Sequence, residues 1–358
     1  MLALLSSLFL AALASAACET ADLNEDPASP LRKLPIYDQD GSGTCYAHEA
    51  ATLVNFELAK ADKKPRDFVN PLFAAWVRHY EDTTFYGSPD NTGGFSADVI
   101  KSLKKMKYCP QHLVEGCLID SKKIGKMNDA KLVHFLEKLW ENYSSFSTGD
   151  AYQEAIDKTV KEDDWIKGDP CAARALAENL KARHLEAISG NEVLKYFFDG
   201  CPASQRNELD IPDPEASSDG PLEAVRKRID DALTRGAPVG IAICAEMLDT
   251  PDVRPLRWQD PTGFSRSSRG NLKKPCGNHA VTVTARRELD GKCMYMIRNS
   301  WGADWHPKNG RCACITVGGT YEPECKKAIF AKEYLGCWYS DEDLMSNVHS
   351  TTIIPEKK

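Results

Sequence analysis

Cys45 is the residue of this sequence best placed to be a reactive thiol. It follows the run Gly41-Ser42-Gly43-Thr44 and begins a segment, 45–60, in which small and apolar residues recur at helical spacing. Backbone N–H groups and the dipole at the start of a helix stabilise a thiolate, the form that attacks an amide carbonyl. Taken alone, a cysteine at a helix start is more often packed or disulfide-bonded, so other parts of the sequence must decide.

Three segments supply the remaining chemical parts in a fixed order. Together they resemble the motifs of the papain family of cysteine peptidases, and they read QDGSGTCYA at 39–47, CGNHAV at 276–281 and YMIRNSWG at 295–302. The resemblance implies a nucleophile at Cys45, a base at His279, an Asn299 that orients this base, and a Gln39 amide that donates to the oxyanion. An acyl-enzyme on Cys45 would be released by water, and no cofactor or metal is implied.

The same resemblance implies a set of substrate-binding residues. The segment NTGGF at 91–95 is similar to the family's glycine loop, whose backbone pairs with substrate, and the other members of the set follow from the alignment of the later motifs. The implied residues are Gly93, Gly94, Ala242, Ala280 and Trp301. Polypeptides are the implied substrates, cut by an endopeptidase, and proteinaceous inhibitors of cysteine peptidases are a second implied class of partner.

The sequence departs from the family pattern in three places. Ser42 stands where the family has a cysteine, so the disulfide that ties this loop is absent or replaced. His279 and Asn299 follow Cys45 at separations about a hundred residues longer than the family's, and the excess falls between Gly94 and Pro238. The stretch before Cys45 is too short for the family's inhibitory propeptide, which we expect to be missing.

Helical patterns come first in the chain and strand patterns come second. Apolar residues at helical spacing occupy 128–142 and 223–236, and 171–185 is rich in Ala, Leu and Glu, whereas short β-branched or apolar runs begin at 238, 280, 294 and 312. This order indicates an α+β fold. With the resemblance, it predicts two lobes, one helical and one an antiparallel sheet or barrel, with the active site in a cleft between them.

We expect a signal peptide over 1–17 and one peptidase domain over 18–358. The helical lobe is placed at about 45–235, with an inserted helical region at about 100–220, and the β lobe at about 236–335. The apolar stretch 2–14 ends in Ala14-Ser15-Ala16, a pattern cut by signal peptidase, and it is too short for a comfortable membrane span. A secreted protein, or one in a periplasmic or lysosome-like compartment, is the expectation, with lipid anchoring at Cys18 as the alternative.

Composition agrees with export. The chain has 358 residues, 13 cysteines and a formal net charge of −7, without a dense basic stripe for nucleic acid. Setting Cys45 aside leaves twelve cysteines, which are fully paired only if Cys18 takes part. We expect a monomer without a transmembrane segment, nucleic-acid partner or structural zinc.

Two other groups of residues could suggest a site, and two functions other than a peptidase remain open. His48-Glu49-Ala50-Ala51-Thr52 lacks the second histidine of a zinc-peptidase helix, and we interpret His48 and Glu49 as a helix-surface pair. Trp305 and His306 are expected to pack rather than catalyse. The alternatives to a peptidase are a papain-like binding protein whose cleft is blocked by the inserted helices, and an enzyme that transfers the acyl group to an amine or cleaves a non-protein amide.

Overall fold

The structure is a computed structural model, and its described residues form one set of helices and one antiparallel sheet. These residues are 18–39, 44–78, 94–111, 201, 203–218, 221–249, 278–303, 305–307, 310–325 and 331–357. The expected signal peptide, Gly93, the helices expected at 128–142 and 171–185, and most of the expected inserted region lie outside them. The helices are α1 Cys45–Lys60, α2 Pro71–Trp76, α3 Ser96–Met106, α10 Leu222–Thr234, α11 Glu246–Asp249 and α12 Asp341–Met345, with short 3₁₀ turns at Pro30–Lys33, Pro65–Asp67 and Ala203–Gln205.

The strands form a single sheet in which every pairing is antiparallel. They are β1 Ala21–Asp22, β2 Glu215–Ser217, β3 Val239–Cys244, β4 Asn278–Leu289, β5 Lys292–Arg298, β6 Arg311–Thr316, β7 Tyr321–Glu322, β8 Ala331–Ser340 and β9 Ser350–Ile353. Their order is β2-β9-β3-β4-β5-β8-β6-β7, with β1 added beside β4. The α+β prediction is confirmed, and within the described residues the sheet is open rather than a closed barrel.

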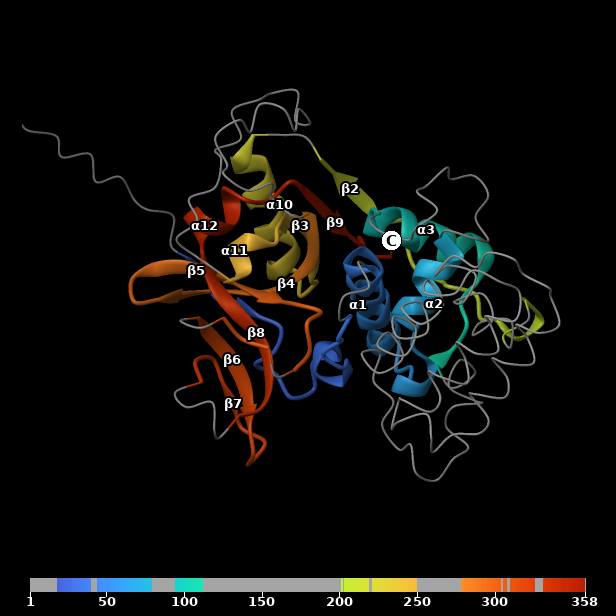
Figure 1. Cartoon of the computed structure of the whole chain (residues 1–358), viewed down its shortest axis with the longest axis horizontal. Helices are drawn as coiled ribbons and strands as arrows, with labels where there is room; N and C mark the ends of the chain where they lie inside the picture. Colours follow the sequence, from blue (N-terminus) through green and yellow to red (C-terminus); the bar gives the residue numbers. More distant parts are fainter. Residues whose placement is uncertain are drawn as a thin grey trace, which may run out of the picture.

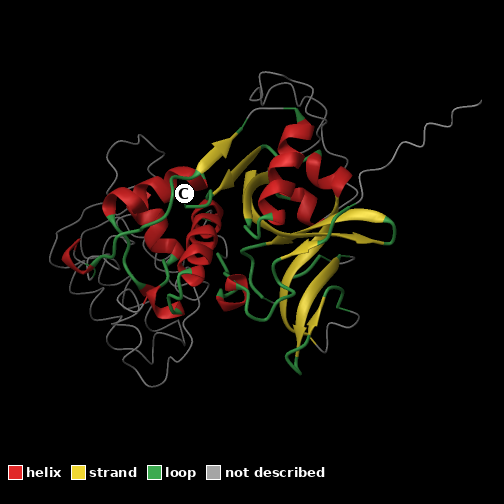
Figure 2. Cartoon of the chain, turned by 180° about the vertical axis from the view of Figure 1, so that it is seen from behind, coloured by secondary structure: helices red, strands yellow, loops and turns green. Residues whose placement is uncertain are grey.

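The helices α1 to α3 and the sheet occupy opposite sides of the molecule. Figure 1 shows α1, α2 and α3 together on one side and the sheet with α10, α11 and α12 on the other, and Figure 2 shows the same division from behind. Each side has its own cluster of buried apolar side chains. We expected the helical part to extend to about residue 235, but α10 packs on the sheet through Ile229 and Leu233. The sheet also continues past residue 335, through β9.

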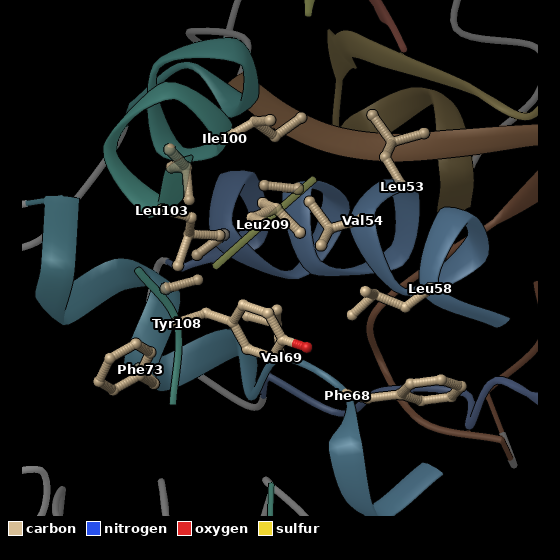
Figure 3. Close-up of a cluster of buried hydrophobic side chains, with 14 of the residues drawn as sticks. Leu53, Val54, Leu58, Phe68, Val69, Phe73, Ile100, Leu103, Tyr108 and Leu209 are labelled. Atoms are coloured by element: carbon tan, nitrogen blue, oxygen red, sulfur yellow. The ribbon is translucent and has the colours of Figure 1, made fainter. Parts of the chain in front are cut away.

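α1 is covered on almost every face. All but two of its residues, Glu57 and Lys60, are buried, including the predicted stripe of Ala47, Ala50, Ala51, Val54 and Leu58. A helix that is apolar nearly all round belongs inside a protein. Small side chains let neighbouring elements approach closely, and Figure 3 shows Leu53, Val54 and Leu58 of α1 among apolar residues from α2, α3 and later segments.

The β4–β5 hairpin has a turn that the sequence encodes and a bulge that it does not. Asp290 and Gly291 both have positive φ angles, 50° and 72°, as a two-residue turn between right-twisted strands requires. The pairing runs regularly from Leu289 opposite Lys292 until Ala285, and then shifts by one residue at Thr284. The start of β4 therefore lies beside the end of β5.

Both ends of the described chain cross between the two sides. Cys18 to Asp22 lies along the sheet, and Leu31 and Leu34 then enter the helical core. At the other end, β9 belongs to the sheet and Ile354, just after it, packs in the helical core. These crossings fix the two sides to one another.

Four disulfides join described residues: Cys18–Cys293, Cys109–Cys201, Cys312–Cys337 and Cys314–Cys325. Cys45 is a free, buried cysteine. Because the Cys18 sulfur is bonded to Cys293, the alternative of a lipid anchor on Cys18 is wrong. This number of disulfides fits an oxidising compartment. No helix in the described part of the chain has the length and apolar character to span a bilayer.

We predict that the Cys18–Cys293 disulfide stabilises the fold more than the Cys312–Cys337 disulfide does. The first joins residues 275 positions apart, whereas the second joins neighbours in the sheet only 25 positions apart. Removing the first by paired Cys→Ser substitutions should lower the free energy of unfolding by about 2–5 kcal/mol, because the unfolded chain regains more conformations. Urea denaturation of both double variants measures this, and equal losses would contradict the loop-closure argument.

Candidate active site

The free thiol lies at the point where α1 meets the sheet. Cys45 is the first residue of α1, and its sulfur lies within hydrogen-bond reach of the Ala280 N–H, near the start of β4. Further backbone N–H groups, those of Cys45 itself and of Tyr46, also face the sulfur. The helix start thus surrounds the sulfur with donors, as the sequence predicted, and packing brings in a donor from the sheet that no local pattern indicated.

His279 and Asn299 form a short hydrogen bond, and His279 directly precedes Ala280, whose backbone N–H lowers the pKa of the Cys45 thiol. The His279 Nε2 lies 2.7 Å from the Asn299 Oδ1, and the Ser300 N–H donates to the same oxygen at 2.8 Å. Because an amide oxygen only accepts, the proton of a neutral His279 belongs on Nε2. Its Nδ1 is then left as an acceptor. The antiparallel hairpin explains why the two side chains meet, since His279 lies near the start of β4 and Asn299 follows the end of β5.

Trp301 covers the histidine. The Trp301 ring stacks on the His279 ring with centroids 4.8 Å apart and an interplanar angle of 28°, and Trp305 meets Trp301 edge to face at 5.0 Å. The indole places apolar surface against the His279 imidazole and limits its contact with water. His306 stacks on Tyr334 at 4.9 Å, so the expectation that Trp305 and His306 serve in packing is confirmed.

Gln39 is held by the segment that follows Asn299. The Gln39 N–H donates to the Ser300 carbonyl at 2.8 Å, the Gly302 N–H donates to the Tyr37 carbonyl at 3.0 Å, and the Ser300 hydroxyl donates to Gln39 Oε1 at 2.5 Å. With its oxygen engaged, the Gln39 amide can present its NH₂ as a donor. Ser42, the site of the missing family cysteine, lies outside the described residues, and this clamp is what anchors the chain just before that loop.

Arg298 holds the segment that precedes Gln39 in the chain. Its guanidinium is buried and donates to the carbonyls of Leu34 at 2.8 Å and Pro35 at 2.7 Å. Burial lowers the pKa of Arg298 to about 10, which still leaves it charged at neutral pH. No sequence pattern indicated the roles of Arg298 and Ser300, although both residues lie within the 295–302 motif.

Burial opposes charge on both members of the thiol–imidazole pair. It raises the pKa of Cys45, while the N–H group of Ala280 lowers this pKa and the nearby Glu49 raises it further. Burial lowers the pKa of His279, and the hydrogen bond to Asn299 raises it. A thiolate or an imidazolium alone is therefore costly here.

The interpretation of His48 and Glu49 as a surface pair is wrong. The two residues are only 1% and 4% exposed, because α1 is covered on the face where the helix would otherwise meet solvent. His48 Nδ1 bonds to the Thr44 carbonyl at 3.0 Å, and burial lowers the pKa of His48 to about 4. The Glu49 carboxyl bonds to Ser96 and packs against Gly240, where a Cβ atom would lie 1.9 Å from Glu49 Oε1.

The implied substrate-binding residues lie close to the pair where the structure describes them. Ala242 and Ala280 face one another across β3 and β4. Gly94 lies against the Tyr46 ring, where a Cβ atom would come within 2.7 Å of a ring carbon, so a side chain there would displace the aromatic ring. Gly93 lies outside the described residues. No group of three or more metal-ligating side chains gathers in the described part of the chain.

No protein-family model and no curated protein matches the sequence. Solved structures that are similar include xylellain, a cysteine protease from Xylella fastidiosa, at 16% identity and a TM-score of 0.47 over 95% of this chain and 86% of that one. Digestive procathepsin L 3 of the Tenebrio molitor larval midgut is similar at 11% identity and a TM-score of 0.39, over 91% and 71% of the two chains. SERA5E from Plasmodium falciparum is similar at 11% and 0.44, over 94% of each.

We predict that the buried Glu49 carboxyl makes the fold less stable as the pH rises. Burial raises its pKa well above the usual value of 4.5, so above pH 4.5 the unfolded chain loses a proton that the folded chain retains. Relative to the wild type, Glu49→Gln should therefore gain free energy of unfolding between pH 4.5 and 8. Urea denaturation across this range measures the gain, with the exposed Glu288→Gln as the matched control. A Glu49→Gln curve parallel to the wild type would contradict the prediction.

Proposed function

We propose that this protein is a cysteine peptidase that hydrolyses polypeptides through Cys45 and His279. The observation that carries the proposal is the His279–Asn299 hydrogen bond of 2.7 Å, together with a free thiol at a helix start that interacts with the N–H of Ala280, the residue after His279. A nucleophile, a base and a group that orients the base are the parts that nucleophilic hydrolysis needs. The sequence resemblance to papain-type peptidases assigns the same three roles to the same three residues.

The reaction begins with proton transfer within the pair. Nε2 of His279 keeps its proton, which it donates in the hydrogen bond to Asn299. Nδ1 is therefore the nitrogen that accepts the proton of the Cys45 thiol. The thiolate then attacks the carbonyl carbon of the scissile bond, and the imidazolium gives its proton to the departing amine. Water, deprotonated by the now neutral His279, attacks the thioester and releases the acid. The protein ends in its starting state, with Trp301 shielding the imidazole throughout.

The oxyanion is assigned to two donors. One is the Cys45 backbone N–H at the start of α1, and the other is the NH₂ of Gln39, whose oxygen is occupied by the Ser300 hydroxyl. Donors fixed before the reaction stabilise the developing charge without reorganisation. The arrangement requires that Ser300 hold Gln39 in one orientation.

The proposed substrates are extended polypeptides cut internally. Gly94, Ala242 and Ala280 carry small side chains or none, which would suit the approach of a peptide backbone. Secretion is proposed as well, since four disulfides join described residues and the first 17 residues have the pattern of a signal peptide. Proteinaceous inhibitors of cysteine peptidases are a proposed class of partner.

The direct test compares the wild type with Cys45→Ala. An internally quenched peptide with blocked termini should be cut by the wild type and not by the variant, while the two unfold at the same urea concentration. Labelling with a thiol-directed epoxide supplies the second readout, and only the wild type should be labelled. A wild type that is neither labelled nor able to cut the peptide would favour the binding-protein alternative, and one that is labelled but cuts no peptide would favour acyl transfer or a non-protein amide. A variant that still cuts would place the nucleophile elsewhere.

We predict that Gln39 and Ser300 act as one unit. Gln39→Ala should lower kcat about 10²-fold, because one oxyanion donor is lost, with a smaller effect on KM. Ser300→Ala should lower kcat less, because the amide remains but loses its fixed orientation. In the double variant Ser300→Ala should have no further effect on kcat, as expected for residues that act through the same bond. Independent, multiplying losses would show that Ser300 has another role.

A further inference from the structure

A small cavity lies behind the catalytic pair, between α1 and the start of the β4–β5 hairpin. Its lining is buried throughout and includes His48, Thr52, Thr282 and Asn299. The space open to the centre of a water-sized sphere is about 10 Å³. This volume is at the lower bound for one buried water, which also needs polar partners.

Two buried polar atoms of the lining residues have no hydrogen-bond partner among the described residues. They are Nε2 of His48 and Nδ2 of Asn299. Most buried polar atoms in proteins are bonded, and an orphaned one costs about 1–3 kcal/mol. Two such atoms on residues that share one cavity call for a common explanation.

The two atoms have complementary chemistry. His48 Nδ1 lies 3.0 Å from the Thr44 carbonyl, which only accepts, so Nδ1 carries the proton and Nε2 is an acceptor. Asn299 Oδ1 accepts from Ser300 N–H and from His279, so its other end is the NH₂ donor. A donor and an acceptor that do not bond to one another can both be satisfied by a molecule that accepts from the first and donates to the second.

We propose that one buried water bridges Asn299 Nδ2 and His48 Nε2, and that His48 is thereby a positioning residue for the catalytic asparagine. This inference rests on the proposed function for its catalytic consequence. The water accepts from Asn299 and donates to His48, while His48 donates to the Thr44 carbonyl. The resulting chain of hydrogen bonds runs from His279 through Asn299, the water and His48 to Thr44, the residue just before the nucleophile.

The consequence is a second restraint on the amide of Asn299. If the Asn299 amide rotated by 180°, its NH₂ would face His279 Nε2, and the imidazole proton would have to move to Nδ1. A protonated Nδ1 could no longer accept the proton of the thiol. Neutral His48 is required, because a protonated ring has no acceptor. Burial lowers the pKa of His48 to about 4, so the ring is neutral at ordinary pH. The titratable or charged groups that face it are Glu49 on α1, His279 on β4, Arg298 of β5 and Tyr37.

The first test is a crystal structure of the full, wild-type chain at a resolution that shows ordered waters. The expected result is a water within about 3.2 Å of both His48 Nε2 and Asn299 Nδ2. A dry cavity, or a water bonded to only one of the two atoms, would overturn the proposal. This measurement does not depend on peptidase activity, so it separates a failure of this inference from a failure of the proposed function.

The second test uses His48→Phe, which keeps a ring and removes the acceptor, and His48→Gln, which restores a polar atom. His48→Phe should lower kcat about tenfold with KM nearly unchanged, and His48→Gln should recover most of the loss. Thr52→Val is the matched control, because Thr52 lines the same cavity but its hydroxyl donates to its own helix, to the His48 carbonyl, at 2.8 Å. An equal loss in Thr52→Val would show that cavity packing alone is responsible, and would overturn the role of His48.

The third test asks whether His48 acts through Asn299. In an Asn299→Ala background, His48→Phe should change kcat less than twofold, as expected if one chain of bonds links them. The rate of Cys45 alkylation by iodoacetamide against pH provides a readout without a peptide substrate. Because the bond to Asn299 raises the pKa of His279, His48→Phe should move the alkaline limb of this profile to lower pH. A full tenfold loss in the Asn299→Ala background, or an unmoved profile in His48→Phe, would overturn the proposal.

Discussion

The packing of α1 against the start of β4 is the contact on which the site depends. It brings the Cys45 sulfur to the Ala280 N–H and places His48 and Glu49 of the same helix against the sheet. Such close approach requires small side chains, which α1 supplies as alanines and β3 supplies as Gly240. Because the helix is buried on almost every face, its position is set by the whole of the surrounding core, and so is the position of Cys45 at its first residue.

The polar groups of the site are arranged in two tiers around this contact. The inner tier holds the thiol, the imidazole, the Asn299 amide and the Gln39 amide. The imidazole bonds to Asn299 Oδ1, the same oxygen accepts from the Ser300 N–H, and the Gln39 amide oxygen accepts from the Ser300 hydroxyl. In the outer tier, Arg298 bonds to the N-terminal segment and His48 bonds to the Thr44 carbonyl, and the proposed water would connect His48 to Asn299. A buried group held in this way loses little orientational freedom, which is what preorganised catalysis needs.

Burial has opposite effects on chemistry and on stability here. It disfavours each isolated charge on Cys45 and His279, it raises the pKa of Glu49 well above 4.5, and it keeps His48 neutral at ordinary pH. The same low-dielectric surroundings strengthen the attraction within a thiolate–imidazolium pair and the bonds to an oxyanion. A site of this kind costs folding free energy in its resting state, and disulfides such as Cys18–Cys293 are one source of compensation.

The sequence by itself determined the local elements and the chemical groups they carry. The period of apolar residues predicted α1 and α10, the β-branched runs predicted β3 to β6, and three motifs identified Gln39, Cys45, His279 and Asn299. Only the tertiary structure decided the bulge at Thr284, which sets how β4 and β5 align, the clamp between Ser300 and Gln39, and the burial of His48 and Glu49. The physical reason is that periodicity records which faces of an element are apolar, whereas the covering of a polar residue is decided by segments hundreds of positions away in the chain.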